Sequence, residues 1–350
     1  MPHLSPEDLA RVIFPVAIEM TGGTTPRLET LPGGASVRRY HRITLDRGKM
    51  RSLVVMELGD NPLKSEEAAK VAPPTELPFI NVQRYLARAG AAVPTIYRYD
   101  VERGLLYLED LGDTTFESRV STANNEVRRA YYRQAIDALI ALQGYAAEHP
   151  DPACIAFSRG FDYDLLKWEL DHFREYGLEA QGHLPTPAQR EELDRVFRRI
   201  AEELAAQPRG FVHRDYQSRN LMVQDSENGP KLRVIDFQDA LLGTRAYDLV
   251  GLLRDSYVAL APELLDELVG YYSARATGNA THFGRLFDLQ VVQRKLKDAG
   301  RFVFIDRVKH NHSFLMHIPN SLDYVAHSLS RLPELSSLRE ILAQYLDTFR

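Results

Sequence analysis

The 350-residue sequence contains a single cysteine, Cys154, so no disulfide bond can form within the chain. This scarcity of cysteine fits a reducing compartment, and we expect a cytoplasmic location. The first eight residues, 1–8, lack the basic segment and the apolar stretch of a signal peptide. No apolar run approaches the roughly 20 residues that a membrane-spanning helix needs. The sequence therefore predicts no insertion into a membrane.

An excess of basic charge is missing as well. The net charge is −5 and the pI is about 6.1, which argues against a general nucleic-acid-binding protein. Hydrophobic residues make up 44% of the chain and charged residues 26%, as in ordinary globular proteins. A chain of this length is expected to form two domains or lobes, and no segment indicates an obligate protein partner.

One segment carries a specific chemical signal. Residues 212–220, Val-His-Arg-Asp-Tyr-Gln-Ser-Arg-Asn, fit the pattern H-R-D-x-x-x-x-N of kinase catalytic loops, and a short apolar stretch then leads to Asp236. The carboxylate of Asp215 can accept the proton of an attacking hydroxyl group. Oxygen atoms of Asn220 and Asp236 can hold Mg²⁺ against the phosphates of ATP. The order and spacing predict phosphoryl transfer, and the plainer alternative is a polar surface turn followed by a buried strand.

The resemblance of residues 212–220 to a kinase catalytic loop implies an α+β, protein-kinase-like fold with two lobes. We expect a small antiparallel-sheet lobe over residues 1–110 that binds nucleotide, and a larger, mostly helical lobe over residues 111–350. A glycine-containing hairpin would cover the phosphates, because small residues let backbone amides approach them. The backbone of a hinge near 109–113 could bind the adenine edge. The expected elements are helices at 3–20, 79–90, 126–148, 162–176 and 186–204, hairpin strands at 37–43 and 51–56, further strands at 93–97 and 105–108, strand-like stretches within 210–236, and mostly helix beyond.

The region after Asp236 argues against a protein substrate. It contains no A-P-E motif, and too few residues precede the next helix to form a peptide-docking segment. A small-molecule acceptor is therefore expected. The motifs His213-Arg214-Asp215, Asn220, 236–239 and Gly243 with 247–249 resemble those of the aminoglycoside phosphotransferase family, also described as choline-kinase-like.

Within that family the chain most resembles bacterial kinases that act on the anomeric hydroxyl of N-acetylmuramate or N-acetylglucosamine in cell-wall recycling. The segments that carry this resemblance are 34–40, 170–176, 236–240 and 293–302. The resemblance implies ATP and Mg²⁺ as cofactors. It also implies that His213 and Asp248 support the catalytic loop rather than take part in the chemistry.

The resemblance assigns further site residues. Nucleotide would contact the hairpin and the hinge, through Gly34, Ser36, Arg38, Arg39, Glu109 and Leu111. Met56 occupies the strand position where protein kinases have a phosphate-binding lysine, and its thioether cannot donate a hydrogen bond. Arginines of the hairpin, including Arg42, are candidates to replace that lysine.

The acceptor is expected to lie between the catalytic loop and the helical lobe. Candidate sugar-binding residues are Glu169, Arg174, Asp239 and Arg301, although each could equally be a solvated charge on a helix. Trp168 and Phe173 could stack on a sugar ring, but their helical spacing also fits core packing. A cation such as Arg301 or Lys295 would suit the lactyl carboxylate of N-acetylmuramate.

Two alternative functions remain open. One is a kinase for another small alcohol, such as an aminoglycoside, choline or a different sugar. Cationic acceptors need an acidic pocket, so the basic cluster of Arg294, Lys295, Lys297 and Arg301 disfavours them if it faces the site. The other alternative is a pseudokinase that binds nucleotide without turnover. The sequence leaves open the choice between ATP and GTP, and the oligomeric state.

Overall fold

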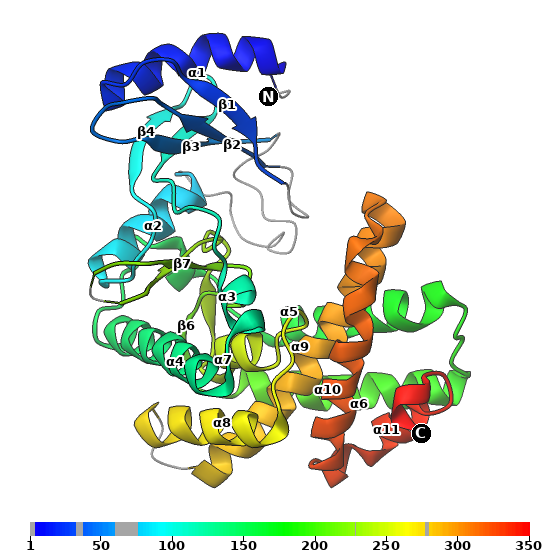
Figure 1. Ribbon diagram of the computed structural model, residues 1–350. Coiled ribbons are helices and arrows are strands. Elements are labelled where there is room, and N and C mark those ends of the chain that lie inside the picture. The colour runs from blue at the N-terminus through cyan, green and yellow to red at the C-terminus, as the bar shows by residue number, and fades with distance from the viewer. Residues whose placement is uncertain (1–3, 33–37, 60–75, 228, 277–279) are drawn as a thin grey trace.

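The structure is a computed structural model that describes residues 4–32, 38–59, 76–227, 229–276 and 280–350. Its N-terminal part is a five-stranded antiparallel sheet with the strand order β1-β2-β3-β5-β4. Figure 1 shows this sheet at the top in blue and cyan, above the helical remainder of the chain. The strands are β1 (Arg27–Thr30), β2 (Arg39–Thr44), β3 (Ser52–Glu57), β4 (Ile96–Asp100) and β5 (Leu105–Leu108).

Helix α1 (Pro6–Thr21) covers the outer face of the sheet (Figure 1). The Ser5 side chain accepts a hydrogen bond from the Asp8 N–H at 3.2 Å, and Pro6 occupies the first turn, which confirms the predicted helix start. Apolar residues of α1 spaced one turn apart pack on alternate residues of the strands, from Ile43 to Tyr107. Because α1 seals this face, the opposite face of the sheet is left for a ligand.

Strands β2 and β3 pair antiparallel, which confirms the predicted hairpin. Strand β1, which the sequence did not predict, pairs with β2 on its other side. The small residues 33–37 therefore fall between β1 and β2. They lie outside the described residues, and so do the predicted nucleotide-binding residues Gly34 and Ser36.

Helix α2 (Pro78–Arg88) lies between the sheet and the helical body. The rings of Phe79 and Phe237 have centroids 4.8 Å apart. Helix α2 therefore packs against the residue that follows Asp236 in the sequence. The Tyr85 hydroxyl donates a hydrogen bond to the His149 carbonyl oxygen at 3.0 Å. These contacts hold α2 against the helical body.

The body contains nine α-helices among the described residues. Helix α5 continues into one π-helical segment, η2 (Phe173–Leu178), and Thr186 and Gln189 form the predicted capping box of α6. In Figure 1, α9 and α10 run side by side, and α8 lies at the lower edge. The helices are α3 (Phe116–Thr122), α4 (Asn125–Glu148), α5 (Tyr163–His172), α6 (Pro187–Ala205), α7 (Ala246–Leu253), α8 (Pro262–Ala276), α9 (Ala280–Lys309), α10 (Ile318–Ser330) and α11 (Ser336–Leu342).

Two short antiparallel pairs carry the catalytic segment. Strand β6 (Arg209–Val212) pairs with β9 (Leu241–Thr244), which was not predicted, and β7 (Leu221–Gln224) pairs with β8 (Lys231–Val234). The predicted α+β architecture, a sheet followed by a mostly helical part, is confirmed. The boundary at residues 110 and 111 stays a prediction. Across the described ranges, no helix combines the length and apolar character needed to span a membrane.

Candidate active site

A cleft of about 790 Å³ lies between the sheet and the helical body. Its lining comes from one face of β2, the hinge after β5, the loops around β6 and β8, and one face of α9. The lining includes eight arginine and lysine residues and six acidic residues. Among the described residues, the lining therefore has more basic than acidic side chains, although the whole chain carries a net charge of −5.

The loop that follows β6 is held by a buried carboxylate on α7. The oxygens of Asp248 accept hydrogen bonds from the backbone N–H groups of His213 at 2.7 Å and Arg214 at 3.0 Å. The Asp215 N–H donates to Nδ1 of His213, and Nε2 of this imidazole lies 3.0 Å from the Ile235 carbonyl oxygen. Burial lowers the pKa of His213 to about 4, so the ring is neutral and Nε2 donates. His213 and Asp248 thus support the loop, as predicted.

Two residues at the floor of the cleft have left-handed backbone conformations. The φ angles are 81° at Arg214 and 62° at Asp236, in a region that residues with side chains rarely adopt. Such conformations cost of order 1–3 kcal/mol each. At Arg214 the cost is offset by two hydrogen bonds, one from its N–H to Asp248 and one to its carbonyl oxygen from Arg294.

The three residues predicted to carry the chemistry come together at this floor. Asn220 Nδ2 donates to the Asp215 carbonyl oxygen at 2.9 Å and lies 3.5 Å from Asp236 Oδ2. All three residues line the cleft. Burial, together with the charge of Asp215, raises the pKa of Asp236 to about 6. The negative charge of Asp236 is therefore poorly offset by its surroundings.

A divalent cation bound with phosphates would fit this donor set. Mg²⁺ is commonly held by one or two carboxylates together with phosphate and water oxygens. The amide nitrogen of Asn220 is bonded to the loop, which leaves its oxygen for a metal, and Asp236 supplies a carboxylate. In the part of the chain that the structure describes, no group of three His, Cys, Asp or Glu side chains could hold a metal ion by itself. This arrangement fits a metal that arrives with its nucleotide.

Arg294 on α9 contacts the loop from below. Its Nη1 donates to the Arg214 carbonyl oxygen at 2.6 Å, and its Nη2 lies 3.7 Å from Asp215 Oδ1. The side chain is 1% exposed, and its guanidinium lies 4.4 Å from the centroid of the Tyr247 ring. A Cβ atom at Gly251 would approach the guanidinium carbon to 3.2 Å. From the sequence, Arg294 was identified only as a member of a basic cluster, because no local pattern links it to Asp215.

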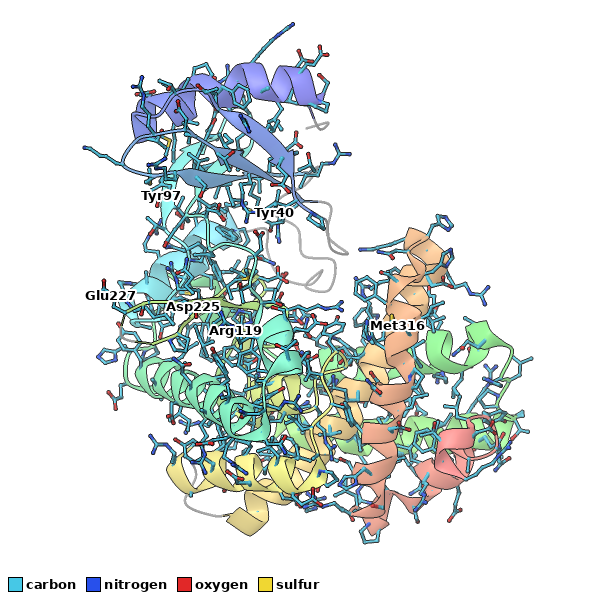
Figure 2. All side chains as sticks on the ribbon, viewed as in Figure 1. Tyr40, Tyr97, Arg119, Asp225, Glu227 and Met316 are labelled. Carbon is cyan, nitrogen blue, oxygen red and sulfur yellow. The ribbon has the colours of Figure 1, made fainter. Side chains whose placement is uncertain are left out.

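The inner face of β2 brings cations to the nucleotide side of the cleft. Arg38, Tyr40 and Arg42 line the cleft, whereas Arg39 does not, because alternate residues of a strand point to opposite faces. Tyr40 lies at the lower edge of the sheet in Figure 2. The Arg42 guanidinium is bonded to Asp110 at 2.8 and 3.1 Å and pairs with Asp113 at 2.8 Å, so it ties β2 to the hinge.

This geometry narrows the choice of a phosphate-binding cation. The charge of Arg38 acts on both Asp236 and Asp239, so this side chain lies near one proposed metal ligand, Asp236, and near Asp239 on the wall of the cleft. Met56 is fully buried between Tyr40 and Leu106 in the sheet. Among the three hairpin arginines, Arg38 is therefore the best placed to take over from the strand lysine.

The hinge residues line the cleft, but the Glu109 side chain is already engaged. Its carboxylate accepts hydrogen bonds from Arg233 at 2.8 and 2.6 Å and from both the backbone and the hydroxyl of Thr95 at 3.0 Å. Leu111 is buried and lines the cleft. A ligand at the hinge would therefore meet the backbone of these residues and the apolar Leu111 side chain.

The structure separates the four candidate sugar-binding residues. Asp239 and Arg301 line the cleft, whereas Glu169 and Arg174 do not. Burial would raise the pKa of Asp239, but the neighbouring charges of Arg214, Arg159 and Arg38 outweigh it and lower that pKa. Asp239 is therefore an ionised acceptor on the wall of the cleft.

Glu169 and Arg174 have other partners. Glu169 is 0% exposed; Gln293 donates to its Oε2 at 2.6 Å, and its Oε1 lies 3.6 Å from Arg214 Nη2. Arg174 pairs with Asp171 and Glu179 at 3.7 and 3.8 Å. Glu169 thus lies against Arg214, and Arg174 joins a separate ion-pair group, so their contact with the acceptor stays a prediction that these positions do not favour.

The two aromatic candidates also differ. Phe173 is buried in the core, and its backbone packs against Gly300 of α9. Trp168 is 43% exposed and stacks on His172 with ring centroids 5.3 Å apart. Neither side chain lines the cleft, so sugar stacking on them is not supported.

Known proteins share both the sequence pattern and the fold. Residues 27–287 match the phosphotransferase enzyme family. The chain is 35% identical over 334 residues to an N-acetylmuramate/N-acetylglucosamine kinase of Pseudomonas aeruginosa, which covers 92% of this chain and 90% of that protein. A kinase of the same name from Pseudomonas putida is 33% identical over 320 residues, covering 89% of this chain and 86% of that protein.

Solved structures are similar at lower identity. A choline kinase from Cryptosporidium parvum has a TM-score of 0.59 at 12% identity, over 95% of this chain and 98% of that chain. An ADP-bound aminoglycoside phosphotransferase has a TM-score of 0.58 at 16% identity, over 93% of this chain and 99% of that chain. At these identities the similarity shows a shared fold.

Proposed function

The chain belongs to the phosphotransferase enzyme family, and from this premise we propose that it is an ATP-dependent sugar kinase of cell-wall recycling. The proposed acceptor is the anomeric hydroxyl of N-acetylmuramate, of N-acetylglucosamine, or of both. The observation that carries the proposal is the meeting of Asp215, Asn220 and Asp236 at the floor of the cleft. The relatives named as kinases of these two sugars support the choice of acceptor.

Nucleotide and metal have distinct places in this proposal. Adenine would lie against the hinge backbone and Leu111, and the phosphates near Arg38, with Gly34 and Ser36 of the hairpin remaining predictions. Asn220 and Asp236 would hold Mg²⁺, which when bound offsets the charge on the phosphate oxygens. The side chain of Arg39 lies outside this arrangement, because it belongs to the other face of β2.

The chain's own residues would carry out the proton transfer. Asp215 accepts a hydrogen bond from the sugar hydroxyl and takes its proton as the oxygen attacks the γ-phosphorus. The bond between that phosphorus and the bridging oxygen breaks, and ADP leaves. The Asp248 carboxylate and the Arg294 guanidinium keep the loop and the Asp215 carboxylate in position throughout.

The charge of the cleft disfavours cationic acceptors. Lys297 and Arg301 both line the acceptor half, next to α9. An aminoglycoside or choline would bring further positive charge to this region, where the lining is already net positive. Within the part of the cleft that the structure describes, no feature favours these acceptors over an amino sugar.

Phosphorus NMR tests the proposal directly. The protein is incubated with Mg-ATP and, in separate samples, N-acetylmuramate, N-acetylglucosamine, choline or kanamycin. We expect a new sugar-phosphate signal with at least one amino sugar, and this signal should disappear after mild acid, because anomeric phosphates hydrolyse easily. A signal with choline or kanamycin alone would exclude the sugar assignment, and no product with any acceptor would support a pseudokinase.

A cytoplasmic location completes the proposal. An enzyme that uses ATP on recycled sugars needs the cytoplasmic nucleotide supply, and the single cysteine, Cys154, fits a reducing compartment. The partners that the proposal requires are therefore ATP and a small sugar.

A further inference from the structure

One face of α9 forms the acceptor wall of the cleft. The lining residues of this helix recur at helical spacing and include Lys297, Arg301 and Ile305. Arg294 lies one turn before Lys297 on the same helix and reaches to within 3.7 Å of Asp215. The face therefore runs outward from the catalytic carboxylate, and its first cleft-lining cation is Lys297.

Lys297 is a buried cation whose nearest carboxylate is shared with a second lysine. Its side chain lines the cleft although the residue is only 9% exposed. Its Nζ lies 3.4 Å from Asp298 Oδ1, but Asp298 pairs more closely with Lys295, at 2.7 Å. One carboxylate is thus shared by two ammonium groups, and Arg294 adds a third positive charge on the preceding turn of α9.

The ammonium group of Lys297 remains protonated despite its burial. Burial lowers the pKa of a lysine, but the surrounding groups Tyr247, Asp298 and Glu169 act in the opposite direction and raise the pKa of Lys297 to about 12. A buried ammonium group that stays charged and lines an open cleft can pair with an anionic group of a ligand.

An apolar surface lies beside this cation. The rings of Phe302 and Phe314 stack with centroids 5.7 Å apart, and both residues line the cleft with Ile305. Aromatic and aliphatic surfaces of this kind accept the apolar face of a sugar ring or an acetyl methyl group. The acceptor wall thus combines an anion site with an apolar patch.

We propose that Lys297 determines acceptor specificity by pairing with a carboxylate on the sugar, so that the enzyme prefers N-acetylmuramate to N-acetylglucosamine. The two sugars differ by the lactyl ether, which carries the carboxylate. This inference rests on the proposed function and deepens it. Glu169 then has a second role, because it lies behind both Lys297 and Arg214 and helps to keep the lysine charged.

Distance along α9 favours Lys297 over Arg301. At a rise of about 1.5 Å per residue, Lys297 lies about 4.5 Å beyond Arg294, and Arg301 lies about 10.5 Å beyond it. The lactyl group is attached to the ring carbon two positions from the anomeric carbon. Its carboxylate therefore stays within one ring width of the hydroxyl that faces Asp215, and the nearer cation can reach it.

The test is the ratio of kcat/KM for N-acetylmuramate to kcat/KM for N-acetylglucosamine. We expect Lys297→Met to lower this ratio roughly tenfold or more, because a charge-assisted pair is lost. Lys297→Arg should keep the ratio within about threefold of the wild type, because the charge remains. Two further variants remove other cations: Arg301→Met, in the cleft, and Lys231→Met, at an exposed position on β8. Both should also keep the ratio within about threefold.

A second measurement changes the substrate instead of the protein, so its outcome does not depend on whether a variant folds. The carboxamide of N-acetylmuramate has nearly the same shape but no charge, so the wild type should use it roughly tenfold less well than the acid. Equal kcat/KM values of the wild type for the acid and the amide would overturn the inference. A kcat/KM ratio of Lys297→Met that stays within about threefold of the wild-type ratio would also overturn it. So would a large drop in this ratio that occurs only in Arg301→Met. Wild-type turnover of N-acetylglucosamine alone would overturn this inference but not the sugar kinase, whereas turnover of neither sugar would overturn both.

Discussion

At the scale of single residues, the Asp215 side chain is accessible to a ligand while the backbone of its loop is held in place. Its side chain is 34% exposed to the cleft, while its neighbours in the loop are buried and held by Asp248. We predict that Asp215→Asn lowers kcat by roughly 10²–10⁴-fold, since the amide cannot take the hydroxyl proton. ATP affinity should change by less than about twofold, since the substituted side chain is assigned to the acceptor hydroxyl rather than to the nucleotide.

Steady-state kinetics and calorimetric titration with ATP provide the two measurements. Near-full turnover by the Asp215→Asn variant would show that another group takes the proton. Parallel losses in turnover and ATP affinity would show instead that the substitution disrupts the whole cleft.

Arg294 is a positioning residue at the same scale. Removing its guanidinium leaves the Arg214 carbonyl oxygen without its donor and Asp215 without its nearest buried cation. We predict that Arg294→Met lowers kcat about 10- to 100-fold, which corresponds to about 1.4–2.7 kcal/mol, with little change in KM for ATP.

The conservative variant distinguishes positioning from general packing. Arg294→Lys keeps one positive donor within reach of the same oxygen atoms, so it should recover part of the lost kcat. If the lysine variant is as slow as the methionine variant while both unfold at the wild-type temperature, charge at this position is not what orients Asp215.

The sequence could predict only part of the site at this scale. Asp215, Asn220 and Asp236 belong to a known sequence pattern, and their spacing predicts that they lie close together. Asn220 precedes β7 and Asp236 follows β8, so the pairing of these two strands brings them to the same end, close to Asp215. Arg294 comes 79 residues after Asp215, and only the packing of α9 against α7 joins them. Glu169 was a candidate to hydrogen-bond the sugar, with a solvated charge on a helix as the alternative. Its side chain is instead buried against Gln293 and Arg214, and no local pattern shows which face of α5 is buried.

At the scale of elements, the packing of α9 against η2 depends on one glycine. A Cβ atom at Gly300 would come within 2.7 Å of Phe173 Cα and 3.0 Å of the His172 carbonyl oxygen, both of which are backbone atoms that cannot move aside cheaply. We predict that Gly300→Ala destabilises the protein by about 1–3 kcal/mol.

The same helix supplies a matched control. Gly284 has no described atom within 4 Å of an added Cβ, so Gly284→Ala should stabilise the protein by up to about 1 kcal/mol through helix propensity. Thermal unfolding of the two variants measures both effects. Equal shifts in Tm in the same direction would show that the close contact at Gly300 has no energetic importance.

Element prediction succeeded where the chain carries local signals. The starts of α1 and α6 follow from a capping side chain and a proline at the first helical position. Strands β1 and β9 have only four residues each, and β1 is largely exposed, so neither shows a clear alternation. Strand β9 is defined by its partner β6, about 30 residues earlier in the chain, which no local pattern reveals.

At the scale of the whole molecule, His172 links stability to pH. It lies among the rings of Trp168, Tyr176 and Phe304, at centroid distances from 4.6 to 5.3 Å. Burial, with the charges of Arg301 and Lys297, lowers the pKa of His172 to about 4. In the unfolded chain the ring takes up a proton below about pH 6.5, while in the folded protein it stays neutral down to about pH 4.

Stability from His172 is thus fully present above about pH 6.5 and is lost as the pH falls towards 4. We predict that the fall in Tm between about pH 7.5 and about pH 5 is smaller in His172→Gln than in the wild type. Buried carboxylates with raised pKa values, such as Asp248, act in the opposite direction in both proteins and cancel in the comparison. An equal fall in both would exclude His172 as a contributor.

The lack of a side chain at Gly251 limits which residues can occupy this position in related proteins. A Cβ atom built at Gly251 would lie 2.9 Å from the Tyr216 carbonyl oxygen and 3.2 Å from the Arg294 guanidinium. Evolution can therefore enlarge residue 251 only in lineages where residue 294 is shorter and the backbone at residue 216 has shifted. In homologous chains the two positions should change together, and a larger residue at 251 should mark enzymes that orient their catalytic aspartate in another way.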